Sequence, residues 1–133
     1  AKFVSAYTAS GLTPDGSSTY FLAKHVGLLR AKELFLTNRM LSADEAKQWG
    51  FVTEVVTHDK LTTKASELAI QIASGPTKAY GGVKRMLLSS FSSPIESQLD
   101  NETRHIVGTM DTHDGPHGLN AFLNKERPRF TGS

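Results

Sequence analysis

Apolar residues recur at spacings of three and four through the second half of this 133-residue sequence. The first such run starts near Lys60 and ends at Gly75-Pro76, a pair that stops a helix. The same spacing predicts helices over residues 77–91 and 95–111 and a short one around 119–123. The positions expected to face inward are Leu61, Ala65, Leu68, Ala69 and Ile72, then Tyr80, Val83, Leu87 and Phe91, and then Ile95, Leu99, Ile106, Val107 and Met110. This pattern leaves little room for a sheet.

The first half of the sequence adds shorter elements. Helices are predicted over residues 17–24 and 27–37, separated by Gly27, and a third starts at the capping box formed by Ser42 and Glu45 and ends at Gly50. Residues 3–7 and 51–56 are rich enough in apolar residues to predict short strands. The fold class is therefore mostly α with one or two short strands.

Three local features of the second half carry specific expectations. Ser93-Pro94-Ile95-Glu96 combines a capping box with a proline at the first helical position. Residues 113–118, "HDGPHG", are expected to form a loop. Gly81-Gly82 lies inside a helical pattern, where glycine is unfavourable, and therefore indicates a close contact with another helix.

Composition excludes several classes of function. The sequence has no cysteine, which excludes disulfides, thiolate metal sites and a cysteine nucleophile. The pI of about 9.0 reflects a net charge of only +2, and no dense basic stripe indicates nucleic-acid binding. No apolar run approaches the roughly 18 residues of a membrane span, and no signal-peptide layout is visible. We expect a cytoplasmic protein that does not bind nucleic acid and has no membrane span.

Catalytic motifs are few. The five histidines show no metal-ligand spacing and no GxSxG elbow is present, so we expect no metal site. The segment "KERPR", 125–129, is either a solvated tail or a small docking site for an anion such as a phosphate. Asp15, in "TPDGSS", is either an ordinary turn residue or a proton carrier.

A resemblance bears on this choice. The string from Phe3 to Val56, with "GLTPDG" and the block "VGLLRAKELFLTNRMLSADEAKQWGFVTEVV", together with the terminal "GLNAFLNKERPRFTG", resembles the second half of the enoyl-CoA hydratase/isomerase, or crotonase, family. The resemblance implies the C-terminal helical part of a ββα spiral fold, without the half that supplies the two backbone N–H groups of the oxyanion hole. We therefore expect a fragment of an acyl-CoA-processing enzyme that is inactive on its own.

The resemblance also implies roles for two residues of the first part. A hydratase of this family has a catalytic glutamate where this sequence has Tyr7, which cannot act as a carboxylate. Isomerase members carry their acidic residue later in the chain, and one of the positions they use is that of Asp15; "SGLTPDGSSTYF" is most similar to isomerases of phenylacetate-type degradation. Asp15 is thus the candidate catalytic residue, moving a proton on a CoA thioester through an enolate. Ser17-Ser18 stand where the family often has Gly-Gly.

The C-terminal part is implicated in binding and assembly. Phe122 and Lys125 match an aromatic and a lysine that approach the CoA of a neighbouring subunit, and the family needs no prosthetic group. The resemblance implies trimers or hexamers. Residues 1–56 are expected to form the end of the crotonase-like core with the catalytic turn, and 57–133 the CoA-capping and oligomerisation region. The alternative is a non-catalytic helical assembly module derived from a crotonase.

Overall fold

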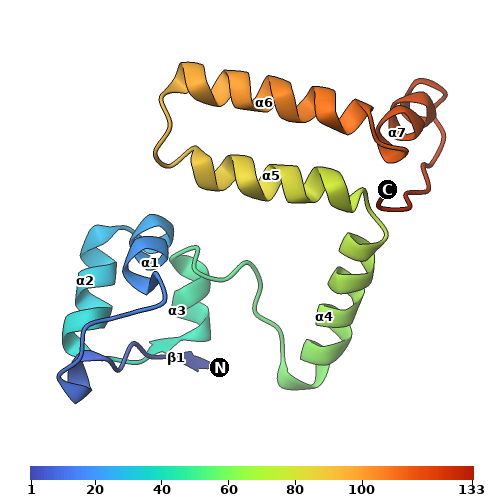
Figure 1. Ribbon diagram of the computed structural model, residues 1–133. Coiled ribbons are helices and arrows are strands. Elements are labelled where there is room, and N and C mark those ends of the chain that lie inside the picture. Colours follow the sequence, from blue (N-terminus) through green and yellow to red (C-terminus); the bar gives the residue numbers. More distant parts are fainter. The chain divides into compact units, whose positions relative to one another are not determined.

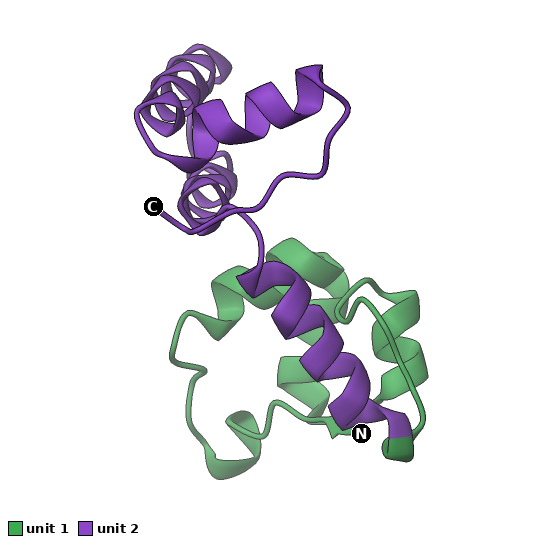
Figure 2. Ribbon diagram, turned by 90° about the vertical axis from the view of Figure 1, so that its right-hand side faces the viewer, with its two compact units in different colours: residues 1–59 green, residues 60–133 purple.

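The computed structural model describes all 133 residues and comprises two compact units, Ala1–Asp59 and Lys60–Ser133 (Figure 2). The fold is mostly helical with two short strands, as predicted. The functional division expected at residue 56 stays a prediction.

The first unit is built from short elements (Figure 1). In chain order these are β1 (Lys2–Phe3), the 3-10 helix η1 (Thr8–Ser10), α1 (Ser18–Val26), α2 (Leu28–Thr37), β2 (Leu41–Ser42) and α3 (Ala43–Gln48). The two strands pair antiparallel, with Lys2 opposite Ser42 and Phe3 opposite Leu41. Gly27 separates α1 from α2, as predicted.

A small apolar core holds this unit together. The buried members come from α1, α2, β2 and α3, and they are Leu22, Val26, Ala31, Leu34, Phe35, Leu41 and Ala46. Phe3 of β1 packs against its edge and meets Phe51 edge-to-face, with the ring centroids 5.2 Å apart. Both strands are therefore fixed to the helices by side-chain packing.

Arg39 links α2 to α3 from outside the core. Its two terminal nitrogens donate to both carboxylate oxygens of Glu45, at 3.0 and 2.7 Å, and its Nε donates to Glu33. The guanidinium groups of Arg39 and Arg30 also lie 5.0 and 4.7 Å from the centre of the Trp49 ring. Hydrogen bonding to Glu45 and Glu33 raises the pKa of Arg39, and the bond from Arg39 lowers the pKa of Glu45.

The second unit contains four helices (Figure 1). They are α5 (Thr77–Ser89), α6 (Ile95–Met110), α7 (Asp114–Leu123) and α4 (His58–Ala73), whose first two residues belong to the first unit. Helices α5 and α6 lie side by side and run antiparallel. The buried Gln98 ties them together, since its Nε2 donates to the carbonyl of Met86 at 3.2 Å and its Oε1 accepts from Ser89 at 3.0 Å.

Two predicted features of the first unit have different outcomes. The Ser42–Glu45 cap is confirmed, because the Glu45 N–H donates to the Ser42 hydroxyl at 3.2 Å, and Gly50 has the expected positive φ of 73°. The strand predicted over residues 51–56 is wrong. The N–H groups of Phe51 and Val52 donate to the carbonyl of Ala46, at 2.9 and 3.3 Å, so this backbone caps α3 instead of pairing.

Two predictions about helix starts are also wrong. Pro94 is the N-cap of α6 and no side chain caps this helix, so Ser93 and Glu96 form no capping box. The predicted loop 113–118 lies mostly inside α7, which begins at Asp114. Pro116 is tolerated there because the N–H groups of a helix's first turn have no intrahelical partner to lose.

The inward faces predicted for α4, α5 and α6 are not covered. Their large apolar side chains, such as Leu68, Val83 and Ile106, are 52%, 47% and 66% exposed. The helices are where periodicity placed them, but no element of this chain packs on their apolar sides. The predicted close contact at Gly82 is confirmed, since a Cβ there would lie 3.4 Å from the His105 ring.

The core of the first unit predicts a specific loss of stability. Leu41 is 1% exposed, so Leu41→Ala should cost about 2–5 kcal/mol. Leu36→Ala, at a side chain 72% exposed, should stay within about 0.5 kcal/mol. Urea unfolding followed by the fluorescence of Trp49, the single tryptophan, reports this unit alone. Equal losses in the two variants would contradict the assigned core.

Candidate functional site

Asp15 lies on the turn that leads into α1. Its backbone carbonyl accepts the Ser18 N–H at 3.0 Å and the Ser18 hydroxyl at 2.7 Å, so the predicted turn role is real. Its side chain is exposed, and its carboxylate accepts no hydrogen bond from the chain. The main chain makes the turn and leaves the carboxylate free for another task.

The residues after Asp15 hold a strained backbone. Gly16 and Ser17 both adopt left-handed conformations, with φ of 58° and 62°. Glycine takes this conformation without penalty, whereas a residue with a Cβ pays about 1–2 kcal/mol. Ser17 therefore sits where a glycine is physically preferred, and conformations of this kind cluster at functional sites.

Asn38 anchors the chain that precedes this turn. Its side-chain Nδ2 donates to the Thr8 hydroxyl at 2.8 Å, and its Oδ1 accepts the Ala9 N–H at 3.2 Å. Asn38 also ends α2 in a left-handed conformation, with φ of 53°. The 3-10 helix is thereby fixed to the end of α2. Tyr7 packs half-buried against the apolar core, which gives this side chain a structural role.

The two residues predicted to contact CoA lie together at the end of α7, in the other compact unit from Asp15. The Lys125 N–H donates to the Phe122 carbonyl at 3.1 Å, and the Glu126 N–H donates to the Ala121 carbonyl at 2.8 Å. This pattern is a Schellman motif, whose left-handed position is usually glycine. Lys125 occupies that position with φ of 57°.

Phe122 does not pack in a core. Its side chain is 77% exposed, although an aromatic on a helix is normally a buried residue. With Lys125 also exposed, an apolar ring and a cation stand next to each other at a helix end. This pair can contact a ligand that carries both a flat apolar group and a phosphate.

A buried carboxylate, missed in the sequence, anchors the segment after Lys125. Asp114 is 4% exposed, and its Oδ1 accepts the Thr131 N–H at 2.9 Å while its Oδ2 accepts the Gly132 N–H at 2.7 Å. The Thr131 hydroxyl and the His113 ring add bonds of 3.1 and 3.2 Å. Burial alone would raise the pKa of Asp114, but these hydrogen bonds outweigh it and lower the pKa from 3.8 to about 2. An acidic residue in a first helical turn was the only sequence signal available.

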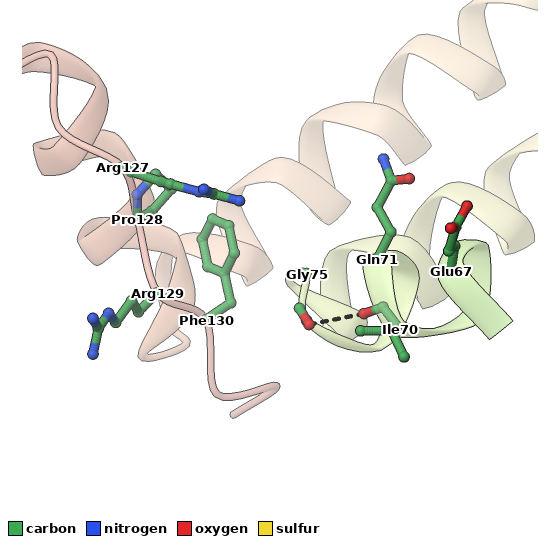
Figure 3. A pocket seen from close by; sticks show the side chains of 9 residues that line it. Glu67, Ile70, Gln71, Gly75, Arg127, Pro128, Arg129 and Phe130 are labelled. Atoms are coloured by element: carbon green, nitrogen blue, oxygen red, sulfur yellow. Dashed lines mark hydrogen bonds between the residues drawn. The ribbon is translucent and has the colours of Figure 1, made fainter. Parts of the chain in front are cut away.

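The anchored segment borders a hollow of about 1120 Å³ (Figure 3). One wall is the end of α4, with Gln71, together with Gly75 just after this helix, and the other is the chain from Arg127 to Phe130. In Figure 3 the Arg127 side chain extends toward α4, while Arg129 turns away from the hollow. Arg127 and Arg129 of the "KERPR" segment both line this hollow, as does Glu67 of α4, and a role of the segment in docking an anion stays a prediction.

The structure contains neither a metal-binding cluster nor a membrane-spanning helix. No three histidine or acidic side chains are grouped closely enough to hold a metal ion. None of the helices combines the length and the apolar character needed to cross a membrane.

Comparison with known proteins places this geometry in a family. The mostly helical fold matches solved structures with the crotonase fold, and in each case it covers about half of the length of the solved chain. An enoyl-CoA hydratase/isomerase from Cupriavidus metallidurans CH34 has a TM-score of 0.90 at 33% identity, covering 98% of this chain and 49% of that one. An enoyl-CoA hydratase from Bacillus anthracis has a TM-score of 0.89 at 33% identity, with coverages of 100% and 52%.

The sequence gives the same assignment. A model of the enoyl-CoA hydratase/isomerase family matches residues 1–133. The 1,2-epoxyphenylacetyl-CoA isomerase of Escherichia coli (strain K12) is 36% identical over 132 residues, which are 99% of this chain and 50% of that protein. The 4-chlorobenzoyl coenzyme A dehalogenase-1 of Arthrobacter sp is 34% identical over 126 residues, 95% and 46% of the two chains.

The chain belongs to the enoyl-CoA hydratase/isomerase family, and the predicted resemblance is confirmed. It spans about half the length of the curated relatives that it matches. Members of this family act on acyl-CoA substrates without a prosthetic group.

The buried carboxylate predicts how stability depends on pH. Because the pKa of Asp114 is lowered on folding, its contribution is fully present above about pH 4 and is lost as the pH falls through about 2. Asp114→Asn should therefore be less stable than the wild type at pH 6, and the difference should vanish near pH 2. Urea unfolding followed by circular dichroism measures this, with the exposed Asp111→Asn as control. A difference that does not change with pH would exclude this role.

Proposed function

We propose that this chain supplies the proton carrier and the CoA-contacting helix end of an enzyme that moves a proton on a CoA thioester. The observation that carries the proposal is the free, exposed carboxylate of Asp15 on a strained turn, in a chain whose whole length matches the family. Similarity to the 1,2-epoxyphenylacetyl-CoA isomerase supports isomerase chemistry, and Tyr7 in place of a carboxylate disfavours simple hydration.

A single carboxylate is sufficient for such a reaction. Asp15 takes a proton from the α-carbon of a 3-enoyl thioester, and the C–H electron pair moves toward the carbonyl oxygen to form a dienolate. The resulting Asp15 carboxylic acid returns the proton to the γ-carbon, the carbonyl re-forms, and a 2-enoyl thioester results. No redox step is required, and the carboxylate is regenerated.

The dienolate oxygen must be stabilised by hydrogen-bond donors, and the family resemblance puts these outside the present 133 residues. Each oxyanion donor is typically worth about 3–4 kcal/mol of transition-state stabilisation. An apolar cover that raises the pKa of Asp15 is also needed, because this carboxylate is exposed here. We therefore propose that chemistry requires a form that contains the other half of the fold, and that this chain alone is inactive.

The end of α7 is proposed to bind the CoA part of the substrate. Phe122 would pack on the adenine ring and Lys125 would pair with a phosphate, which accounts for an exposed aromatic and a strained lysine at one helix end. Arg127, beside the hollow shown in Figure 3, adds a second cation to this region.

Assembly into a homo-oligomer, a trimer or hexamer, is the proposed role of the exposed apolar faces. Side chains such as Leu87, Leu99 and Val107 are 62%, 56% and 57% exposed on α5 and α6. Apolar surface of this extent on a folded protein indicates an interaction site. The same faces favour the alternative function, a non-catalytic assembly module, which the next experiment separates from the enzyme.

Asp15 is tested by proton exchange. In D₂O, a full-length form of the protein should exchange the α- or γ-protons of an enoyl-CoA, and Asp15→Asn should slow this exchange about 10²- to 10⁴-fold while CoA still binds. Asp44→Asn, at another exposed carboxylate of the same unit, is the matched control. Exchange that survives in Asp15→Asn would leave Asp15 a turn residue, and a full-length form without any exchange would favour the assembly module.

Two substitutions at Lys125 separate binding from backbone strain. Lys125→Gln removes the charge and keeps the strain, whereas Lys125→Gly removes both, so only the glycine variant should gain stability, by about 1 kcal/mol. Both should weaken CoA binding roughly tenfold, measured by calorimetry on the same full-length form. Lys47→Gln, at an exposed position in the first unit, is the control. Unchanged affinity in both variants would assign Lys125 to the helix end alone.

A further inference from the structure

A second cationic region, separate from Phe122 and Lys125, lies between α5 and α6. These helices enclose a hollow of about 610 Å³, a size typical of small-molecule sites. Its charged lining consists of Lys78 and Arg85 from α5 and Arg104 from α6, and the His105 ring of α6 lies beside them. No aspartate or glutamate lines it.

Glycines create the space. Gly82 is buried on α5, where a Cβ would meet the His105 ring at 3.4 Å, and Gly108 lies on the facing side of α6, where a Cβ would meet nothing within 4 Å. Glycine is the residue least suited to a helix interior after proline. Close packing against His105 explains the glycine at position 82. At position 108 a larger side chain would fit, so packing does not explain the glycine there.

The cations of the hollow are poorly neutralised. Arg104 pairs with Asp100 at 2.8 Å, but both side chains are largely exposed, at 69% and 61%. Lys78 and Arg85 form no ion pair within the chain. His105 is positioned by its Nδ1, which lies 2.9 Å from the Asn101 carbonyl. Like charges gathered around one hollow repel one another, and an anionic ligand removes this repulsion.

The spacing of the cations limits the ligand. Lys78 and Arg85 are seven residues apart on one helix, which corresponds to a distance of roughly 10 Å along the axis. A ligand with two phosphoryl groups can span this distance and contact both side chains. Arginine side chains form paired hydrogen bonds to phosphate oxygens, and two of them face this hollow.

We propose that the hollow between α5 and α6 binds a small molecule that carries at least two phosphoryl groups. Arg85 and Arg104 hold the phosphoryl oxygens, Lys78 contacts the far end, and the glycine surface of α5 and α6 lets the ligand approach the backbone. This site is independent of the proposed acyl-CoA reaction and uses none of its residues.

Titration of the 133-residue chain with inorganic pyrophosphate, followed by ¹H–¹⁵N NMR at 0.1 M salt, tests the proposal. Saturable shifts are expected at the amides of Gly81, Gly82 and Gly108. Arg85→Gln and Arg104→Gln should each weaken binding roughly tenfold. Lys84→Gln, which removes a neighbouring cation outside the lining of the hollow, should leave the affinity unchanged.

A steric variant removes binding without removing charge. Gly108→Leu has room for its Cβ, keeps the helix and fills the open part of the hollow, so pyrophosphate binding should be lost while the circular dichroism spectrum is retained. The proposal is overturned by non-saturable shifts, by shifts confined to residues 125–129, by equal weakening in Lys84→Gln and Arg85→Gln, or by full binding in Gly108→Leu.

Discussion

Burial of large apolar side chains is confined to the first unit, and the rest of the structure depends on this constraint. The core around Leu41 and Ala46 fixes α1, α2 and α3, and through Asn38 it also fixes the 3-10 helix before the Asp15 turn. The second unit has no comparable core. Gln98 joins α5 to α6 and Asp114 joins α7 to the C-terminal segment, so hydrogen bonds connect parts of this unit where apolar packing connects those of the first.

The two candidate positions lie one in each unit, and each is held by its own local contacts. Asp15 and Lys125 both sit where the backbone is held in position by local hydrogen bonds, and both side chains point away from any core. Ser17 and Lys125 occupy left-handed positions that glycine would fill without strain. A carboxylate at a strained turn and a cation at a strained helix end are consistent with the chemistry of the family, which joins proton transfer to recognition of a CoA thioester.

The exposed helix faces and the cationic hollow are two sides of the same pair of helices. On α5 and α6 the small and cationic residues, such as Gly82 and Arg85, line the contact between the helices, and the apolar residues, such as Leu87 and Ile106, face outward. An ordinary isolated helix pair would bury the apolar side. An exposed apolar side of this kind is typical of a surface that contacts another protein surface, which agrees with the proposed assembly, and the hollow on the other side is the proposed phosphoryl site.

Local physical chemistry was enough to determine most helices from sequence, because periodicity, Gly27, Gly50 and the Ser42–Glu45 cap act within a few residues. The turn at Asp15 was predictable for the same reason. The structure alone decided that residues 51 and 52 cap α3 instead of forming a strand with residues 53–56, that Pro116 lies inside a helix, and that Asp114 is buried under Thr131 and Gly132. Each of these depends on a partner that the local pattern does not name, and burial of a helix face requires a second surface that no single segment specifies.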